Sequence, residues 1–75
     1  MKVVPASENA LMIYFSQVVS ADTSARVRQA TVVLESALVD VLIDLVPSYA
    51  SLLVIFDLSR IEATTLEQQI TALLD

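Results

Sequence analysis

Carboxylates are the side chains of this sequence whose types and spacing come nearest to a catalytic arrangement. Asp40 and Asp44 flank the start of a predicted strand, and Asp57 ends another, so two carboxylates could meet at one end of a sheet. Paired carboxylates act as a general acid and a general base when a further acid-base group or a cofactor stands beside them. No such partner or cofactor motif accompanies these residues, and we expect solvated strand ends or turn caps.

Histidine, cysteine and glycine are absent from the 75 residues. Without them the chain has no imidazole base, no thiol nucleophile, no disulfide and none of the usual zinc ligands. Glycine-rich phosphate loops are excluded too, because their backbone must approach the phosphates where a Cβ would intrude. The sequence therefore predicts no catalytic, cofactor-binding or metal-binding residue.

Two other groups of residues could suggest a functional site, but their surroundings favour structural roles. Tyr49 and Ser51 resemble a hydroxyl pair, yet Ser51 has no visible base, so we expect packing and turn roles. Met12, Tyr14 and Phe15 alternate along a predicted strand, which indicates core and surface positions rather than a ligand cage.

The composition is that of one small acidic domain. Four basic and nine acidic side chains give a net charge of −5, and so few cations cannot build the basic patch that a nucleic-acid backbone requires. Pro5 and Glu8 interrupt the N-terminal apolar segment before it could form a secretory signal. Uninterrupted aliphatic or aromatic runs such as Leu52–Phe56 are far shorter than the roughly 20 residues of a membrane-spanning helix. We expect a single soluble, cytoplasmic domain over residues 1–75, with no nucleic-acid or membrane partner.

The elements that would position these residues begin with a hairpin. A valine-rich run at residues 2–6 and an apolar run at 10–15 flank the cluster Ser7-Glu8-Asn9, which favours two strands joined by a tight turn. Asn9 is the turn residue most able to accept a left-handed conformation, because its short amide can bond locally.

A helical period replaces the strand pattern after Ser20, and we expect a helix over roughly residues 21–39. Ser20 is a good N-cap, and Asp22 lies in the first turn, where the helix dipole favours an anion. Val32 and Val33 widen the apolar face, which suggests that more than one side of the helix is covered. The apolar stripe recurs every three or four residues, at Val27, Ala30, Thr31, Leu34, Leu38 and Val41.

A second hairpin follows, with strand-like runs at residues 41–46 and 51–56. Pro47 either begins the turn between them or sits on an edge strand, because it cannot donate a ladder hydrogen bond. The later strand is apolar at five successive positions, which implies burial on both faces or a central place in the sheet.

The last element is a helix with an apolar stripe at Leu66, Ile70, Leu73 and Leu74. Two capping boxes could start it, one at Ser59 with Glu62 and one at Thr64 with Glu67, and we favour Thr64 because it lies directly before the stripe. The order is then ββαββα. It predicts an α+β two-layer sandwich, an antiparallel four-stranded sheet with both helices on one face.

The predicted core lies between the sheet and the helices and includes Leu34, Leu53, Ile55 and Ile70. With 56% apolar residues, the chain carries more apolar surface than one such core can hide, since a domain of this size buries only about 60% of its unfolded surface. We therefore expect the isolated chain to self-associate at high concentration through a strand edge or the outer face of the sheet. Met12, Tyr14 and Val54 cannot all point towards the helices if the strands alternate.

In residue order, the run Val46–Asp57 resembles the V-P-[A/S]-Y-x-S-L-L-V-x-[Y/F]-D signature of the allophanate hydrolase subunit 1 family. That family includes the histidine-kinase inhibitor KipI and the PxpB component of bacterial 5-oxoprolinase. The start of the chain, residues 5–15, is similar to the family's P-x-G-D-x-A-L-L-V-x-F, and Arg26-Val27 with Leu34 resembles its first-helix pattern. The motif positions, for which we expect structural roles, are Ala10, Val46, Pro47, Tyr49, Ser51, Leu52, Leu53, Val54 and Asp57. Two positions depart from the family pattern: Ser7-Glu8 replaces Gly-Asp, and Ser24 replaces a common helix asparagine.

The resemblance implies that residues 1–75 are the N-terminal domain of such a protein, without the cyclophilin-like C-terminal domain that family members carry. It implies a non-catalytic docking role in a complex that opens 5-oxoproline in an ATP-dependent reaction, with a partner 5-oxoprolinase subunit. ATP would then belong to the parent complex, and this domain would hold no cofactor. The alternative implied by the same family is a KipI-like module that inhibits a sensor histidine kinase.

Overall fold

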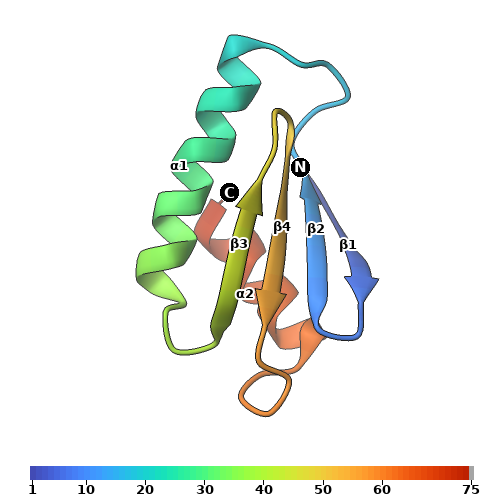
Figure 1. Ribbon diagram of the computed structural model, residues 1–75, viewed down its shortest axis with the longest axis vertical. Coiled ribbons are helices and arrows are strands. Elements are labelled where there is room, and N and C mark those ends of the chain that lie inside the picture. The colour runs from blue at the N-terminus through green and yellow to red at the C-terminus, as the bar shows by residue number, and fades with distance from the viewer. Residues whose placement is uncertain (75) are drawn as a thin grey trace.

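The computed structural model describes residues 1–74. In chain order the elements are β1 (Lys2–Ser7), β2 (Ala10–Tyr14), α1 (Ala21–Ala37), β3 (Leu42–Pro47), β4 (Ser51–Phe56) and α2 (Ala63–Leu74). The strands form one antiparallel sheet, and the helices form a second layer (Figure 1). The predicted α+β class and ββαββα order are confirmed.

The strands are arranged in the order β1-β2-β4-β3, so β4 is central and β1 and β3 are the edges. The central place expected for the apolar run of β4 is confirmed. Both prolines lie on edge strands, Pro5 in β1 and Pro47 at the end of β3, where a missing backbone N–H need not break a central ladder.

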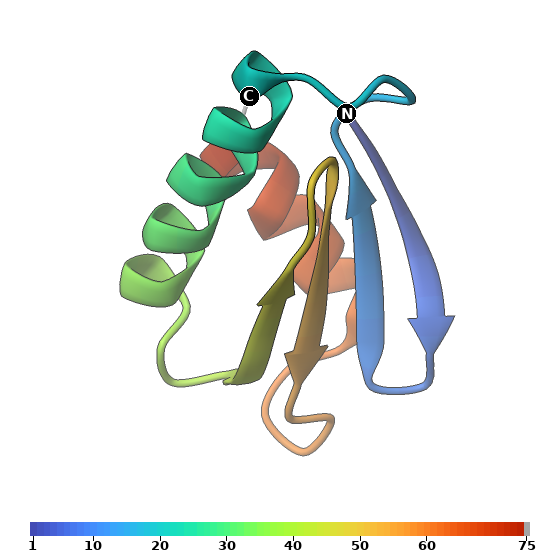
Figure 2. The same cartoon turned by 45° about the horizontal axis from the view of Figure 1, so that its top comes forward.

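Both helices pack against the same face of the sheet (Figure 2). The register pairs Leu11 with Val54 and Ile13 with Leu52, and all four side chains are buried under the helices. Buried side chains of the helices and of the C-cap of α1 close this core: Val27, Ala30 and Leu34 in α1, Leu38 at its C-cap, and Leu66 and Ile70 in α2. The expected burial of Leu34 and Ile70 is confirmed.

The expected position of Leu53 and Ile55 between sheet and helices is wrong. Both are only partly buried, while Leu52 and Val54 beside them are fully buried. Successive side chains of a strand point to opposite faces, so Leu53 and Ile55 lie on the side that carries no helix. The apolar run of β4 therefore supplies the core and also the uncovered face.

Helix α1 begins as expected and ends slightly earlier than the predicted residue 39. Ser20 is the N-cap, and its Oγ accepts a hydrogen bond from the Thr23 N–H at 3.1 Å. The expectation that the widened apolar face is covered on more than one side is wrong within the described chain, because Val32 is 66% exposed and Val33 39% exposed.

The turn after β1 does not use the left-handed conformation that Asn9 could accept, and the predicted cap of the last helix is wrong. No residue among 1–74 adopts a positive φ, so Asn9 is not left-handed; instead the Ser7 hydroxyl donates to the Asn9 side-chain oxygen at 3.0 Å. Helix α2 begins at Ala63, and the Leu66 N–H donates to the Glu62 carbonyl at 2.9 Å. Thr64 thus lies inside the first turn instead of capping it.

Candidate functional site

Asp57 follows β4 and holds the turn that leads to α2. Its Oδ1 accepts hydrogen bonds from the Ser59 N–H at 2.9 Å and the Ser59 hydroxyl at 2.6 Å. The Arg60 Nε lies 3.4 Å from its Oδ2. These bonds from Ser59, and to a lesser degree the Arg60 charge, lower the pKa of Asp57 below its usual value. A carboxylate held ionised in this way is a turn cap and a poor general acid.

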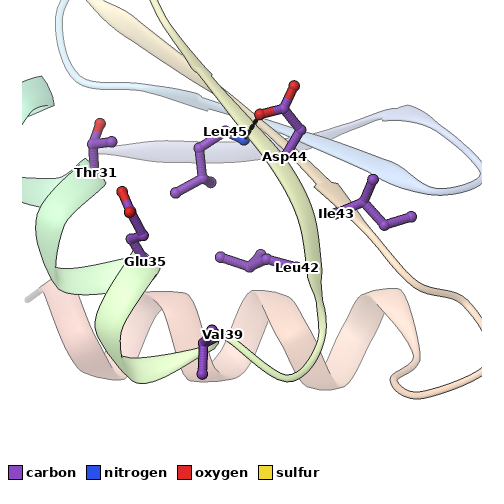
Figure 3. Close-up of a pocket in the computed structure, with 7 residues that line it drawn as sticks. All are labelled: Thr31, Glu35, Val39, Leu42, Ile43, Asp44 and Leu45. Atoms are coloured by element: carbon purple, nitrogen blue, oxygen red, sulfur yellow. Dashed lines mark hydrogen bonds between the residues drawn. The ribbon is translucent and has the colours of Figure 1, made fainter.

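The carboxylates near β3 do not form a pair. Asp44 Oδ1 accepts from the Leu45 N–H at 2.8 Å, and Figure 3 shows Asp44 on one side of β3 with Glu35 on the other. Glu35 points into an open groove of about 310 Å³ between α1 and β3, floored by Leu42 and Leu45. Asp40 is exposed in the turn after α1. Within residues 1–74 no group of three or more His, Cys, Asp or Glu side chains could hold a metal ion.

The hydroxyl residues of the family motif lie in and beside the turn between β3 and β4. Tyr49 is 72% exposed at this turn, and the Ser48 N–H donates to the Ser51 carbonyl at 2.8 Å to close it. The Ser24 hydroxyl of α1 donates to the Tyr49 carbonyl at 3.1 Å. Ser24 therefore ties the helix to the turn, a role that its place in the sequence pattern did not reveal.

The sheet face opposite the helices, which we call the outer face, is not covered by either helix. The sequence prediction had placed two of its residues, Leu53 and Ile55, in the core. The register brings Val4, Met12, Leu53 and Val46 into one row across all four strands. Ile55 lies in the adjacent row beside Ala10, and Tyr14 extends the face at the far end of β2. The expected separation is confirmed, because Val54 lies under the helices while Met12 and Tyr14 lie on the outer face.

The two edge strands of the sheet have features that hinder the addition of a further strand. Pro5 and Pro47 have no N–H to offer a further strand. On β3 the Leu45 N–H is already bonded to Asp44, and the register of both edge strands is irregular, at Pro5/Ser7 and at Leu42/Asp44. Such features are typical of protected edges, so the face is better suited to a partner than the edges are.

The outer face is almost free of charge. Lys2 and Asp44 stand on its two edge strands, and the positions between them are mainly aliphatic. A sheet face that meets water normally alternates polar residues with the apolar residues of the core side. The outer face keeps polar residues only at its margins, at Lys2, Ser7, Ser51 and Asp44, and its centre is apolar.

Comparison with known proteins agrees with the resemblance at the level of the family. The family model described as "Carboxyltransferase domain, subdomain C and D" matches residues 1–75. The chain is also similar to a solved structure, the conserved uncharacterized protein PH0987 from Pyrococcus horikoshii, with 29% sequence identity and a TM-score of 0.91. That match covers 97% of this chain and 34% of PH0987, so the chain spans about a third of its neighbour's length. No curated protein matches, and no helix within residues 1–74 is long and apolar enough to cross a membrane.

Proposed function

This chain belongs to the family of the carboxyltransferase domain, subdomain C and D, and from that membership we propose that it is a non-catalytic docking domain. The family is that of allophanate hydrolase subunit 1 and of PxpB, the 5-oxoprolinase component. In the proposed role the domain belongs to a cytoplasmic complex that opens 5-oxoproline to glutamate at the expense of ATP. Other parts of that complex supply the reactive groups and bind the nucleotide.

The apolar outer face is the observation that carries this proposal. The residues that could do chemistry serve local structure, as Asp57 does in its turn and Asp44 does on its strand. The residues of the outer face, in contrast, lie outside the core cluster that the helices close on the other side of the sheet. A domain with a completed core and a second, uncovered apolar face is suited to hold another part of a protein in place.

The length of PH0987 supports a place within a longer protein. This chain matches 34% of that neighbour, which leaves most of the neighbour's chain for further structure. We place the present chain at the N-terminal end of its parent protein, followed by the cyclophilin-like domain that the resemblance implies.

Co-purification from the native cell tests the proposal. A tagged full-length gene product should recover the partner 5-oxoprolinase subunit, and the recovered complex should hydrolyse 5-oxoproline when ATP is supplied. The 75-residue chain by itself should show no turnover above background. Turnover by the chain alone that is lost in Asp44→Asn or Asp57→Asn would show that the domain is catalytic.

The same experiment separates the enzyme role from kinase inhibition. A KipI-like module would recover a sensor histidine kinase, and adding it would lower the autophosphorylation of that kinase. Recovery of the kinase in place of the 5-oxoprolinase partner would contradict the enzyme role.

A further inference from the structure

The open groove between α1 and β3 combines an aliphatic lining with one carboxylate that points into it (Figure 3). We propose that this groove receives a lysine or arginine side chain of a partner protein. The Glu35 carboxylate binds the cationic head, and the aliphatic residues of the groove contact the stem. Such a contact does not depend on whether the domain serves an enzyme complex or a kinase.

The lining of the groove suits the stem of a long cationic side chain. Leu42 and Leu45 are partly buried, pack against the core and form the floor. Val39, in the turn after α1, lies at one end of the groove and is 66% exposed. The groove encloses about 310 Å³. The methylene stems of lysine and arginine pack on apolar surface of this kind while their charged heads remain near water.

Glu35 is the group in the groove that can bind a cation. Among residues 1–74, no basic side chain lines the groove, and none forms an ion pair with Glu35. Asp44 borders the groove but lies on the other side of β3, where its Oδ1 accepts the Leu45 N–H. The hydroxyl of Thr31, at the end of the groove away from Val39, donates to the Val27 carbonyl at 2.8 Å. Glu35 therefore keeps its carboxylate for a cation from outside the chain.

Charge complementarity selects a basic occupant. The chain carries a net charge of −5, and a charge of this sign attracts basic proteins and raises their rate of encounter. An acidic side chain in the groove would be repelled by Glu35. An uncharged side chain would remove water from the carboxylate without giving it a partner, which costs free energy. A lysine or arginine avoids both costs and adds a charge-assisted hydrogen bond.

The openness of the groove favours a side chain on a protein surface over a free small molecule. Sites for small ligands bury about 70–90% of the ligand surface, and this groove lies open to solvent. A side chain presented by a protein needs less enclosure, because the residues beside it can cover the exposed Val39. The partner does not have to add a strand, which the bonded Leu45 N–H and Pro47 on β3 hinder.

A capped peptide that carries one lysine tests the contact. The probe is the acetylated and amidated pentapeptide Ala-Leu-Lys-Leu-Ala, and its uncharged counterpart has norleucine in place of lysine. Binding is followed at low salt through the amide NMR spectrum of the isotope-labelled 75-residue chain. Glu35→Gln removes the proposed charge, and Glu67→Gln on α2, outside the groove, is the matched control. Glu35 is exposed, so its substitution should leave the fold intact, which circular dichroism checks.

The lysine peptide should bind about fivefold more tightly than the norleucine peptide, as expected for one ion pair at a protein surface. Its spectral changes should centre on residues 31–45. Glu35→Gln should abolish the preference for lysine, and Glu67→Gln should retain it. Equal binding of the two peptides would overturn the proposal, as would a preference that survives Glu35→Gln. Unchanged signals from residues 31–45 up to about 10 mM peptide would overturn it too.

Lysine capped at both ends, without flanking residues, separates a protein partner from a free small amine. It should bind at least about fivefold more weakly than the pentapeptide, because it lacks the leucines that can cover Val39 and the aliphatic lining. Equal affinity of the capped lysine and the pentapeptide would overturn the choice of a protein partner in favour of a free amine.

Discussion

The two faces of the sheet are built from the same strands but have different roles. On β4, Leu52, Val54 and Phe56 are fully buried beneath the helices, whereas Leu53 and Ile55, which alternate with them, remain partly exposed. The inner face meets the apolar stripes of α1 and α2 and completes the core. The centre of the outer face is also apolar, but no helix packs against it. An apolar sequence alone therefore does not identify the core.

The neighbouring residues Leu52 and Leu53 provide a matched pair for testing the difference between the two faces. Leu52→Ala should cost about 3–5 kcal/mol of unfolding free energy, because the removed atoms leave a cavity between the sheet and the helices. Urea unfolding followed by circular dichroism measures the loss. A cost below about 1 kcal/mol would show that the helices do not pack on this face.

Leu53→Ala makes the same chemical change one residue later and should cost much less. Because Leu53 is partly exposed on the outer face, the expected loss in the isolated chain is about 1–1.5 kcal/mol, from its contacts with neighbouring strands. The same urea titration gives the value. A loss equal to that of Leu52→Ala would mean that the outer face is buried even in the isolated chain.

Self-association of the isolated chain tests the outer face by itself, and we expect this association to be weak. The size of the outer face predicts association only near about millimolar concentration, detectable as a concentration-dependent mass in sedimentation. Leu53→Glu should abolish it, since each copy would bury an unpaired carboxylate. The matched control Val32→Glu, on the exposed side of α1, should associate as the unsubstituted chain does. Equal association of both variants would place the contact away from the outer face.

The smallest expected effect concerns Asp57, which follows the inner-face residue Phe56. Hydrogen bonds from Ser59, with help from Arg60, lower the pKa of Asp57 in the folded chain. Its contribution to stability is therefore present above the unfolded-state value of about 3.9 and is lost as the pH falls through the lower folded-state pKa. Asp57→Asn should narrow the difference between the urea midpoints at neutral and acid pH. An unchanged difference would show that the hydrogen bonds from Ser59 to Asp57 contribute nothing to the pH dependence of stability.

Much of the fold could be predicted because local patterns and tertiary packing agree. The spacing of Val27, Leu34 and Leu38 predicted a helix, and Ser20 predicted its start, since caps and periodicity are properties of a few neighbouring residues. The face assignment of Leu53 and Ile55 failed because a continuous apolar run carries no period-2 signal. Which of the two faces the helices cover is decided by long-range packing.

The candidate site was predictable mainly by exclusion. The lack of histidine, cysteine and glycine leaves few reactive arrangements, and Asp57 could be expected to cap a turn from its place after a strand. The protection of the β3 edge could not be expected, because the bond from the Leu45 N–H to Asp44 depends on a local side-chain rotamer. The link from Ser24 to Tyr49 joins residues far apart in sequence, and periodicity carries no information about such a contact.

The most direct test of the division between a folding face and a docking face is the unfolding free energy of Leu53→Gln in two settings. In the isolated chain the substitution should cost about 1 kcal/mol or less, because the amide can still reach water. In the full-length protein, where the proposed docking role puts an apolar partner on the outer face, the same substitution should cost at least about 1 kcal/mol more, because the amide is then buried against an apolar surface. An equal cost in both settings would contradict the account.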